Sequence, residues 1–501
     1  MRHPLPYAYA KANSVLLEDD GASLVLWAPA EISLATLSEV QRLYLIDRFE
    51  QEAASSLAER INAAYAGSES SAAVVIGEVE SAVDLSRMMQ DLPAVEDLLE
   101  AANDAPIIRM LNALLTQAAK DGASDIHIEP YERASSVRFR VDGTLREVVQ
   151  PNRGLHAALI SRLKIMAELD IAEKRLPQDG RISLRIGGRA IDVRVSTLPS
   201  AHGERAVLRL LDKTESKFTL EGLGMSGDVL DAFKRLVQQP HGIVLVTGPT
   251  GSGKTTSLYA SLQTVDTSTT NVLTVEDPIE YELAGVGQTQ VNAKIDLTFA
   301  KALRAILRQD PDVIMIGEIR DYETAQIAIQ ASLTGHLVLA TLHTNDAPSA
   351  VTRLTDMGVE PFLLSSSLLG VLAQRLVRKL CPVCKRAEVV DGPDAGPPQG
   401  GASPLGGQRS GEAASVGAHV RWHPVGCEAC SRTGYKGRTG VYELMVADEE
   451  VRHLMHQRAA ESELQAAAQK GGLRSMREDG QRLIDAGITS VEEVLRVTRE
   501  S

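Results

Sequence analysis

Residues 248–255 read GPTGSGKT and match every fixed position of the phosphate-loop pattern G-x-x-x-x-G-K-[ST]. The apolar run GIVLVT (242–247) precedes them, and TTSLYASLQTV (255–265) follows with the composition of a helix. A strand that enters a glycine-rich loop and opens a helix directs backbone N–H groups and the helix N-terminus at one point. An ordinary glycine-rich turn is the alternative, but strand, loop, lysine, threonine and helix together favour nucleotide binding.

Distinct roles follow for the residues of this loop. We expect Lys254 to reach the β- and γ-phosphates of ATP, and the Thr255 hydroxyl to bind Mg²⁺. The glycines allow the backbone to close around a phosphate that a Cβ atom would obstruct. The residues expected to contact the nucleotide are Gly248, Pro249, Thr250, Gly251, Ser252, Gly253, Lys254, Thr255 and Thr256.

Acidic residues follow two apolar strands of the same region. The strand 313–316 (VIMI) leads to Glu318, which could polarise the attacking water or act through the Mg²⁺ shell. Gly317 stands where an aspartate is usual, which leaves direct metal ligation open on the residues alone. Glu276 and Asp277 end the preceding strand, and ligands bind beyond the carboxyl ends of such strands. We expect both to face Mg²⁺ or water, the alternative being an acidic turn before a proline.

Two histidines bracket the apolar strand 337–341 (LVLAT), with His336 before it and His343 after it. A lone histidine is more often structural. A pair around a strand of the nucleotide sheet could instead report the γ-phosphate to moving parts of the protein, so both are candidate functional residues.

Arginines are dense in the region before residue 213. In a ring ATPase, a neighbouring domain inserts arginines that neutralise the charge of the transition state. The alternative, a solvated basic face of a sheet, is favoured on the residues alone. The arginines concerned are Arg185, Arg189, Arg194, Arg205 and Arg209.

All four cysteines belong to two CxxC pairs, Cys381/Cys384 and Cys427/Cys430, separated by the 42 residues 385–426. In a reducing compartment such pairs indicate a metal site rather than disulfides. Four thiolates suit tetrahedral Zn²⁺ and leave no open position, so a structural zinc site is expected, with free or redox thiols as the alternative.

The composition indicates a multidomain globular protein. The chain has 501 residues, of which 44% are hydrophobic and 24% charged, and its net charge is −14. The negative charge argues against a mainly nucleic-acid-binding surface. No apolar run approaches the ~18–20 residues of a membrane span, and the N-terminus lacks a signal-peptide core. We therefore expect a cytosolic chain whose membrane role, if it has one, is exerted through a partner.

Hydrophobic periodicity divides the chain before the phosphate loop. A helical stripe over 37–49 and a second helix at 55–64 indicate a small first domain, assigned to 1–80, with a connecting segment at 81–99. A helix at 106–119 followed by alternating strands indicates an α+β domain with a mostly antiparallel sheet, assigned to 100–212.

The remaining boundaries follow changes in composition. A polar, Gly-containing linker is expected at 213–226, and strands alternate with helices over 227–376 as in a wound α/β nucleotide domain. The cysteine subdomain covers 377–437, and its Gly/Pro/Ser-rich part, 391–417, is expected to be a flexible loop. Residues 438–501 are expected to be mainly helical.

These motifs together resemble the secretion ATPase superfamily of type II secretion and type IV pilus motors, from about residue 100 to the end. The matching stretches are GASDIHIEP (122–130), the phosphate loop, TVEDPIEY (274–281), RQDPDVIMIGEIRD (308–321), TGHLVLATLHTND (334–346) and the cysteine pairs. In that family the four central stretches are the Walker A motif, the aspartate box, Walker B and the histidine box. The family's Walker B strand itself ends in Gly-Glu, and Arg194 and Arg209 best match its nucleotide-reaching arginines.

Within the superfamily, the chain is most similar to the E subunit of type II secretion. LPYAYAKANSVLL (5–17) resembles that family's first domain, and four cysteines are usual there. Pilus-extension ATPases share the layout and are the alternative.

The resemblance implies an α/β protein. A RecA-like ATPase domain would follow a PAS-like α+β domain and a small N-terminal docking domain, with a zinc subdomain and a helical C-terminus. It implies ATP, Mg²⁺ and Zn²⁺ as cofactors. The residues carrying turnover would be Lys254, Glu276, Asp277, Glu318, His336, His343, Arg194 and Arg209.

The same resemblance implies a hexameric cytoplasmic motor, peripheral on the inner membrane, that powers pseudopilus assembly and protein export. Its N-terminal domain would dock on an inner-membrane component with a cytoplasmic domain (the L-type subunit). A polytopic platform protein (the F-type subunit) would receive the motion.

Two other classes stay open on the sequence. One is a non-catalytic, zinc-bearing interaction protein whose phosphate loop only senses nucleotide; Glu318, Glu276 and Asp277 argue against it, because binding alone needs no placed acid. The other is a DNA-translocating or conjugation ATPase, which the net charge of −14 disfavours, so no nucleic-acid partner is expected.

Overall fold

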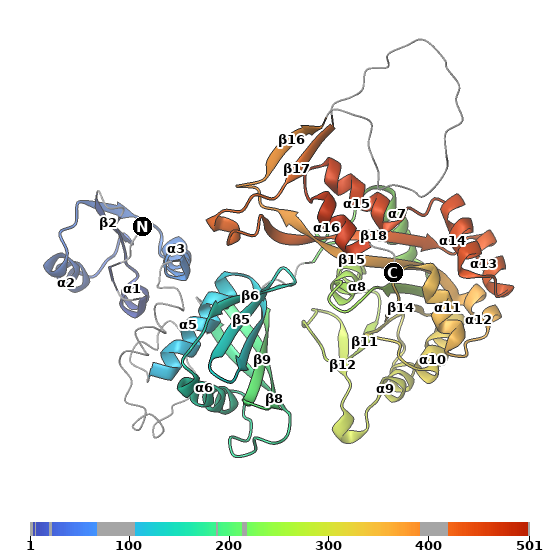
Figure 1. Cartoon of the computed structure of the whole chain (residues 1–501), viewed down its shortest axis with the longest axis horizontal. Helices are drawn as coiled ribbons and strands as arrows, with labels where there is room; N and C mark the ends of the chain where they lie inside the picture. Colours follow the sequence, from blue (N-terminus) through green and yellow to red (C-terminus); the bar gives the residue numbers. More distant parts are fainter. Residues whose placement is uncertain are drawn as a thin grey trace, which may run out of the picture. The chain divides into compact units, whose positions relative to one another are not determined.

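The computed structural model describes residues 4–5, 7–19, 23–67, 106–186, 189–212, 218–390 and 419–498. The chain divides into two compact units, Met1–Glu215 and Ser216–Ser501, and Figure 1 labels many of their helices and strands. The predicted connecting segment 81–99 and the predicted flexible loop 391–417 lie outside the described residues. No helix within the described ranges is long and apolar enough to cross a membrane.

The first sheet of the N-terminal unit has three strands in the order β1-β2-β3, with β1 antiparallel and β3 parallel to β2. A small core that includes Val15, Leu17, Leu26 and Val40 packs against it. Its elements are α1 (Tyr7–Asn13), β1 (Leu16–Asp19), β2 (Leu24–Ala28), α2 (Leu34–Leu43), β3 (Arg48–Gln51) and α3 (Ala54–Gly67).

The helix predicted over 37–49 is only partly correct, because α2 ends at Leu43 and the chain continues into β3. Tyr44 leaves the helix with an extended backbone (φ −136°, ψ 138°). The Asp47 N–H then donates to the Leu24 carbonyl at 2.9 Å, which starts the pairing of β3 with β2. Tyr44 and Ile46 still pack against the core from this extended stretch, so the apolar spacing continues beyond the helix.

The second sheet of this unit has six strands in the order β6-β5-β4-β9-β8-β7, with every neighbouring pair antiparallel, as the sequence predicts. Helices α5 and α6 share one hydrophobic core with the sheet. The elements are α5 (Pro106–Lys120), β4 (Ala123–Pro130), β5 (Ser135–Val141), β6 (Thr144–Val149), α6 (Arg153–Met166), β7 (Gln178–Ile186), β8 (Arg189–Ser200) and β9 (Gly203–Asp212).

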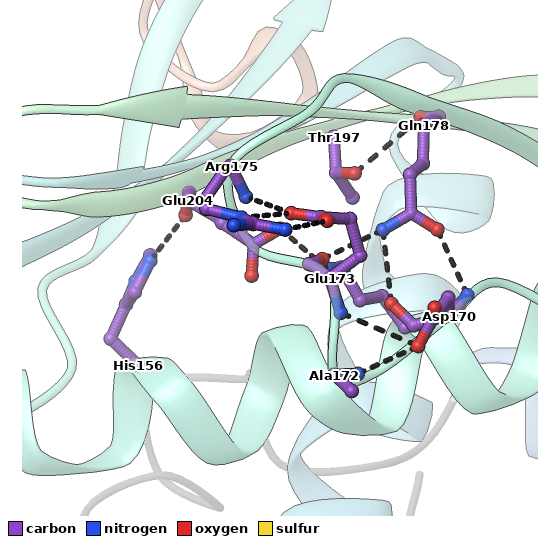
Figure 2. Close-up of polar contacts among 9 residues, drawn as sticks. His156, Asp170, Ala172, Glu173, Arg175, Gln178, Thr197 and Glu204 are labelled. Atoms are coloured by element: carbon purple, nitrogen blue, oxygen red, sulfur yellow. Dashed lines mark hydrogen bonds and ion pairs between the residues drawn. The ribbon is translucent and has the colours of Figure 1, made fainter.

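A polar network holds the loop between α6 and β7 (Figure 2). Asp170 Oδ1 accepts the N–H groups of Ala172 and Glu173 at 2.8 and 3.3 Å. The side-chain amide of Gln178 donates to the Asp170 and Glu173 carbonyls, each at 2.9 Å. The buried Lys164 Nζ also donates to the Glu173 carbonyl at 2.6 Å. The loop conformation is therefore fixed by side chains as well as by backbone.

The C-terminal unit contains a seven-stranded sheet in the order β12-β11-β13-β14-β10-β15-β18, parallel except for the β15–β18 pair. This confirms the predicted α/β class. Its elements up to β15 are α7 (Gly227–Val237), β10 (Gly242–Thr247), α8 (Lys254–Leu262), β11 (Val272–Glu276), β12 (Gly287–Gln290), η1 (Ala293–Ile295), α9 (Phe299–Ile306), β13 (Val313–Ile316), α10 (Tyr322–Leu333), β14 (Leu337–Leu342), α11 (Pro348–Asp356), α12 (Pro361–Ser367) and β15 (Leu368–Leu380).

Both faces of this sheet are covered, as near-continuous apolar strands require. Along β10, Ile243 and Leu245 face the core formed with α9, α10 and the C-terminal helices, whereas Val244 and Val246 face the core formed with α7 and α8. Because both faces of β10 are buried, the part left accessible is the chain beyond its carboxyl end. The phosphate loop begins there.

Two long strands were not predicted. β15 and β18 (Tyr435–Val446) pair antiparallel and extend the central sheet, so the boundaries expected at 376/377 and 437/438 fall inside a paired ribbon. The remaining elements are β16 (Arg386–Val390), β17 (His419–His423), η2 (Glu428–Cys430), α13 (Glu449–His456), α14 (Glu461–Lys470), α15 (Met476–Asp485) and α16 (Val491–Thr498). The predicted helical C-terminus is confirmed from Glu449 onward.

The second half of the predicted linker is packed rather than free. Within 218–226, Leu220 and Met225 are buried in the core shared with α7 and α8. The Leu223 carbonyl accepts the Tyr442 hydroxyl at 3.0 Å and the Gly440 N–H at 2.9 Å. These residues belong structurally to the C-terminal unit.

Candidate active site at the phosphate-loop edge of the sheet

Three neighbouring strands deliver the main motifs to one edge of the sheet. β14 lies between β10 and β13, and all three are parallel, with Thr247 opposite Leu342 and Ile316 opposite Ala340. Their carboxyl ends therefore meet at one edge, where the phosphate loop, Glu318 and His343 follow directly. The loop after β14 is tied to β10, because the Thr344 N–H donates to Thr247 Oγ1 at 2.8 Å.

The phosphate loop needs glycine at two positions for steric reasons. Gly248 has φ +146°, and a Cβ there would lie 2.4 Å from the Gln374 carbonyl oxygen. Gly253 precedes α8 in the left-handed region (φ 87°) and turns the loop into the helix. Thr255 and Thr256 lie in the first turn of α8, half-buried. The geometry matches the predicted strand–loop–helix unit.

Lys254 is folded back onto its own loop. Its Nζ donates to the carbonyls of Gly248 and Pro249 at 2.8 and 3.1 Å, and the residue is 9% exposed. Burial lowers the pKa of the ammonium group, while the nearby Glu318 opposes that shift. An incoming phosphate would offer this ammonium a charged acceptor in place of two neutral carbonyls.

Glu318 stands between two basic side chains. Its Oε1 is 3.1 Å from His343 Nε2, and its Oε2 accepts Arg320 Nε at 2.7 Å. Burial and the positive charge of Lys254 lower the pKa of His343. A neutral His343 is therefore favoured near pH 7, able to hold the Glu318 carboxylate or a water molecule through a hydrogen bond.

The acids after β11 differ in environment. Glu276 is 2% exposed, and its Oε1 accepts Thr274 Oγ1 at 2.7 Å and Gln288 Nε2 at 2.9 Å. Its Oε2 accepts the hydroxyl of Tyr259, which lies on α8. Asp277 is exposed and begins the cis Asp277–Pro278 bond. Glu276 is therefore a fixed carboxylate, and Asp277 is the one open to solvent.

His336 lies away from the phosphate loop within this chain. It precedes β14, and its carbonyl accepts the N–H of Gly242, the first residue of β10, at 3.1 Å. Its Nδ1 is 2.8 Å from the Ala331 carbonyl. The two bracketing histidines are thus a full strand apart, and only His343 joins the edge that carries Lys254 and Glu318.

The candidate arginines belong to the N-terminal unit. Arg194 of β8 and Arg209 of β9 are directly paired in register. Arg209 Nε donates to Asp125 Oδ1 at 3.0 Å, while 58% of its side chain stays exposed. Arg205, four residues earlier on the same strand, pairs with Glu129 at 2.7 Å in the same manner.

The four cysteines come together where the β15–β18 ribbon ends, and their Sγ atoms all lie within 4.8 Å of one another. The Cys381–Cys427, Cys384–Cys430 and Cys427–Cys430 sulfur separations are 3.9, 3.8 and 3.8 Å. A tetrahedron with metal–sulfur bonds of about 2.3 Å has edges of about 3.8 Å, so the thiols fit a tetrahedral metal ion.

Backbone N–H groups support negative charge on this cluster. The N–H of Gly426 donates to Cys384 Sγ at 3.3 Å, and that of Gly434 donates to Cys430 Sγ at 3.2 Å. Such donors favour thiolate ligands and orient them, which agrees with the predicted metal-binding chemistry.

Comparison with known proteins gives the family. A model for "Type II/IV secretion system protein" matches residues 100–496, and a model for a domain of "GSPII protein E" matches residues 4–65. The chain is 60% identical over 499 residues to the type II secretion system protein HxcR of Pseudomonas aeruginosa, covering 99% of both chains. The chain belongs to the type II secretion system ATPase E family.

Further similarities agree with this assignment. The type II secretion system ATPase E of Vibrio cholerae is 50% identical over 505 residues, covering 99% of this chain and 97% of that one. Among solved structures, the pilus retraction motor PilT with bound ADP shares 25% identity at a TM-score of 0.50, covering 77% of this chain and 96% of that one. The ATPase DotB of Legionella pneumophila shares 22% identity at a TM-score of 0.56, with coverages of 82% and 98%, and supports the fold alone. The type II secretion ATPase is thus an enzyme with the N-terminal domain of GSPII protein E and a four-cysteine cluster.

Two residues of this secretion ATPase that touch the site were not predicted. Gln374 of β15 is 2% exposed, and its Nε2 donates to the Ser252 carbonyl at 2.7 Å, bracing the phosphate loop from a strand 122 residues away. Tyr259 holds Glu276 from α8. For Gln374, only its polar character within an apolar stretch of sequence could have indicated this role. For Tyr259, nothing in the pattern of its helix distinguishes it from other buried residues.

Proposed function

We propose that this ATPase hydrolyses MgATP at the edge formed by β10, β14 and β13. The loop 248–255 would hold the phosphates, Lys254 would contact the β- and γ-phosphates, and Thr255 would bind Mg²⁺. Glu318 would orient and polarise the attacking water. The single observation carrying the proposal is the position of Glu318, which lies 3.1 Å from His343 and close enough to Lys254 to affect the pKa of its ammonium group.

The other candidates would have supporting roles. Asp277, exposed beside the fixed Glu276, is suited to the water shell of Mg²⁺, and Glu276 would set the geometry of that acidic loop. His343 would sense the γ-phosphate through Glu318. His336 lies at the other end of β14, so any role for it would be exerted on a part of the assembly other than the phosphate loop of its own chain.

Arg194 and Arg209 would complete the site from the N-terminal unit. Their adjacent positions on β8 and β9 and the exposed side chain of Arg209 support this role. Arginines that neutralise the transferring phosphoryl group are worth several orders of magnitude in turnover. Because they belong to a separate unit, hydrolysis would be linked to movement of that unit relative to the one that carries the phosphate loop.

At the level of the machine, the protein would form a ring, expected to be a hexamer, at the cytoplasmic face of the inner membrane. There it would power pseudopilus assembly and protein export. The domain at 4–65 would dock on an inner-membrane component with a cytoplasmic domain, and a polytopic platform protein would receive the motion. Light scattering of the chain with MgATP tests the ring, and a chain lacking residues 4–65 tests recruitment to membranes.

The four-cysteine cluster would hold Zn²⁺ through Cys381, Cys384, Cys427 and Cys430. The sulfur separations of 3.8–3.9 Å and the N–H donors to sulfur support this ion, and with four protein ligands the site would be structural.

The Glu318→Gln variant tests the hydrolytic mechanism. Glutamine keeps the shape of the side chain but cannot take a proton from water, so the variant should bind MgATP normally and lose at least about 100-fold in turnover. Equilibrium nucleotide binding and phosphate release measure the two properties separately. Turnover near the parent rate would show that Glu318 is not the acid that activates water.

A further inference from the structure

Tyr259 links the phosphate-loop helix to the acidic loop after β11. It lies on α8, five residues beyond Lys254, and its side chain is fully buried. Its hydroxyl donates to Glu276 Oε2 and accepts the N–H groups of Glu280 and Tyr281 at 3.2 and 3.5 Å. One hydroxyl thus joins α8 to both ends of the segment 276–281.

The hydroxyl also helps to orient the Glu276 carboxylate. Thr274 Oγ1 and Gln288 Nε2 both donate to Oε1, at 2.7 and 2.9 Å, whereas Tyr259 donates to Oε2. Burial and the charge of Glu276 raise the pKa of the Tyr259 hydroxyl, so it stays a neutral donor throughout the physiological range. Removing it would leave one carboxylate oxygen buried without this donor.

Aromatic contacts also connect Tyr259, through Tyr281, to Phe218, which lies in the segment that enters the C-terminal unit. The Tyr281 ring meets the Tyr259 ring edge-on, with centroids 6.2 Å apart, and meets the Phe218 ring in the same way at 5.2 Å. Phe218 is the first residue described after 213–217. A shift of either α8 or this segment would therefore reach the acidic loop through packed rings.

A purely structural role is the simpler alternative, since buried tyrosines generally need an acceptor. Tyr442 is such a residue: it is 2% exposed, and its hydroxyl donates to the Leu223 carbonyl at 3.0 Å. Tyr259 differs because its acceptor is an acid at the nucleotide edge and because its helix starts at the phosphate loop.

We propose that Tyr259 is a positioning residue for ATP turnover, holding Glu276 and Asp277 in a fixed relation to the phosphate loop. The inference rests on the proposed role of these acids. It predicts that loss of the hydroxyl slows the chemical step without weakening nucleotide binding, because the loop 248–255 itself is unchanged.

The test compares Tyr259→Phe with Tyr442→Phe in the full chain, each losing one buried hydroxyl. We expect kcat of Tyr259→Phe to fall about tenfold or more, with KM for ATP within about threefold of the parent, and kcat of Tyr442→Phe to stay within about twofold. Equal kcat values for the two variants, or a matching loss of nucleotide affinity in Tyr259→Phe, would overturn the inference.

Two further variants separate the possible failures. Glu276→Gln at the parent kcat would overturn the role of the acid itself, whereas a slow Glu276→Gln beside a parent-like Tyr259→Phe would overturn only the role of Tyr259. If Tyr259→Phe does not fold, Thr274→Val removes another donor to Glu276 while keeping the side-chain shape. It should lower kcat at constant KM, and an unchanged kcat would overturn the positioning claim.

Discussion

At the residue scale, the phosphate loop needs glycine at residues 248 and 253. A Cβ at residue 248 would lie 2.4 Å from the Gln374 carbonyl oxygen, and residue 253 needs a left-handed backbone to start α8. Only the second demand is local, so a short motif expresses it; the first comes from Gln374, which also braces the loop. The support of the loop by Gln374 comes from 122 residues along the chain, and nothing in the sequence of the loop itself encodes it.

Arg209 provides the sharpest test of the proposed contribution from the N-terminal unit. Replacement by alanine should lower turnover at saturating MgATP by at least about 100-fold, because the transferring phosphoryl group loses a neutralising charge. Nucleotide affinity should change little, since the phosphate loop is intact. Steady-state turnover and equilibrium binding of MgATP to the assembled protein give the two values.

Arg205→Ala is the matched control for this experiment. Arg205 lies on the same strand as Arg209 and pairs with Glu129 as Arg209 pairs with Asp125. Equal losses of turnover in the two variants would indicate a general effect of breaking ion pairs on β9, and the assignment of Arg209 to the nucleotide would be wrong.

At the element scale, the β15–β18 ribbon joins two features that lie far apart in the sequence, the phosphate loop and the four cysteines. Its middle holds Gln374 under the phosphate loop, and the four cysteines gather where it ends. The Leu380 N–H and the Lys385 Nζ also donate to the carbonyls of Ile488 and Gly487, at 2.7 and 2.8 Å. A bound metal would therefore stabilise both the ribbon and the turn before α16.

The metal content of the purified protein tests the proposed zinc site. The purified chain should contain about one zinc per molecule, and Cys384→Ser should lose it, because three thiolates bind Zn²⁺ less tightly than four. Without the ion, the melting temperature should fall by several degrees. Elemental analysis and thermal denaturation with and without a chelator provide the measurements. Fully reduced protein with no bound metal and an unchanged melting temperature would contradict a structural zinc site.

At the scale of the whole molecule, the sequence predicted the α/β unit with its acid strand and the preceding antiparallel sheet. Both have regular periodicity and local turn signals such as Asp142-Gly143. The less accurate predictions involve long-range pairing. The extension of the sheet by β15 and β18 and the packing of Leu220 and Met225 depend on partners distant in the chain.

The positions of His336 and His343, which belong to one motif, could likewise not be read from their sequence spacing. They lie close together in sequence, but a parallel strand between them sends one to each edge of the sheet. Sequence spacing alone does not show at which end of the strand each histidine lies. The direction of β14 does, and it places only His343 at the edge of the sheet that carries Lys254 and Glu318.

Steady-state ATP turnover by the full-length Lys254→Ala protein shows whether ATP is hydrolysed at the loop 248–255. Lys254 donates its hydrogen bonds to carbonyls of its own loop, so the variant should keep its melting temperature within a few degrees. Its turnover should fall by at least about 100-fold, because the ammonium group no longer stabilises the charge on the γ-phosphate. Hydrolysis at the parent rate by a correctly folded Lys254→Ala protein would contradict the account.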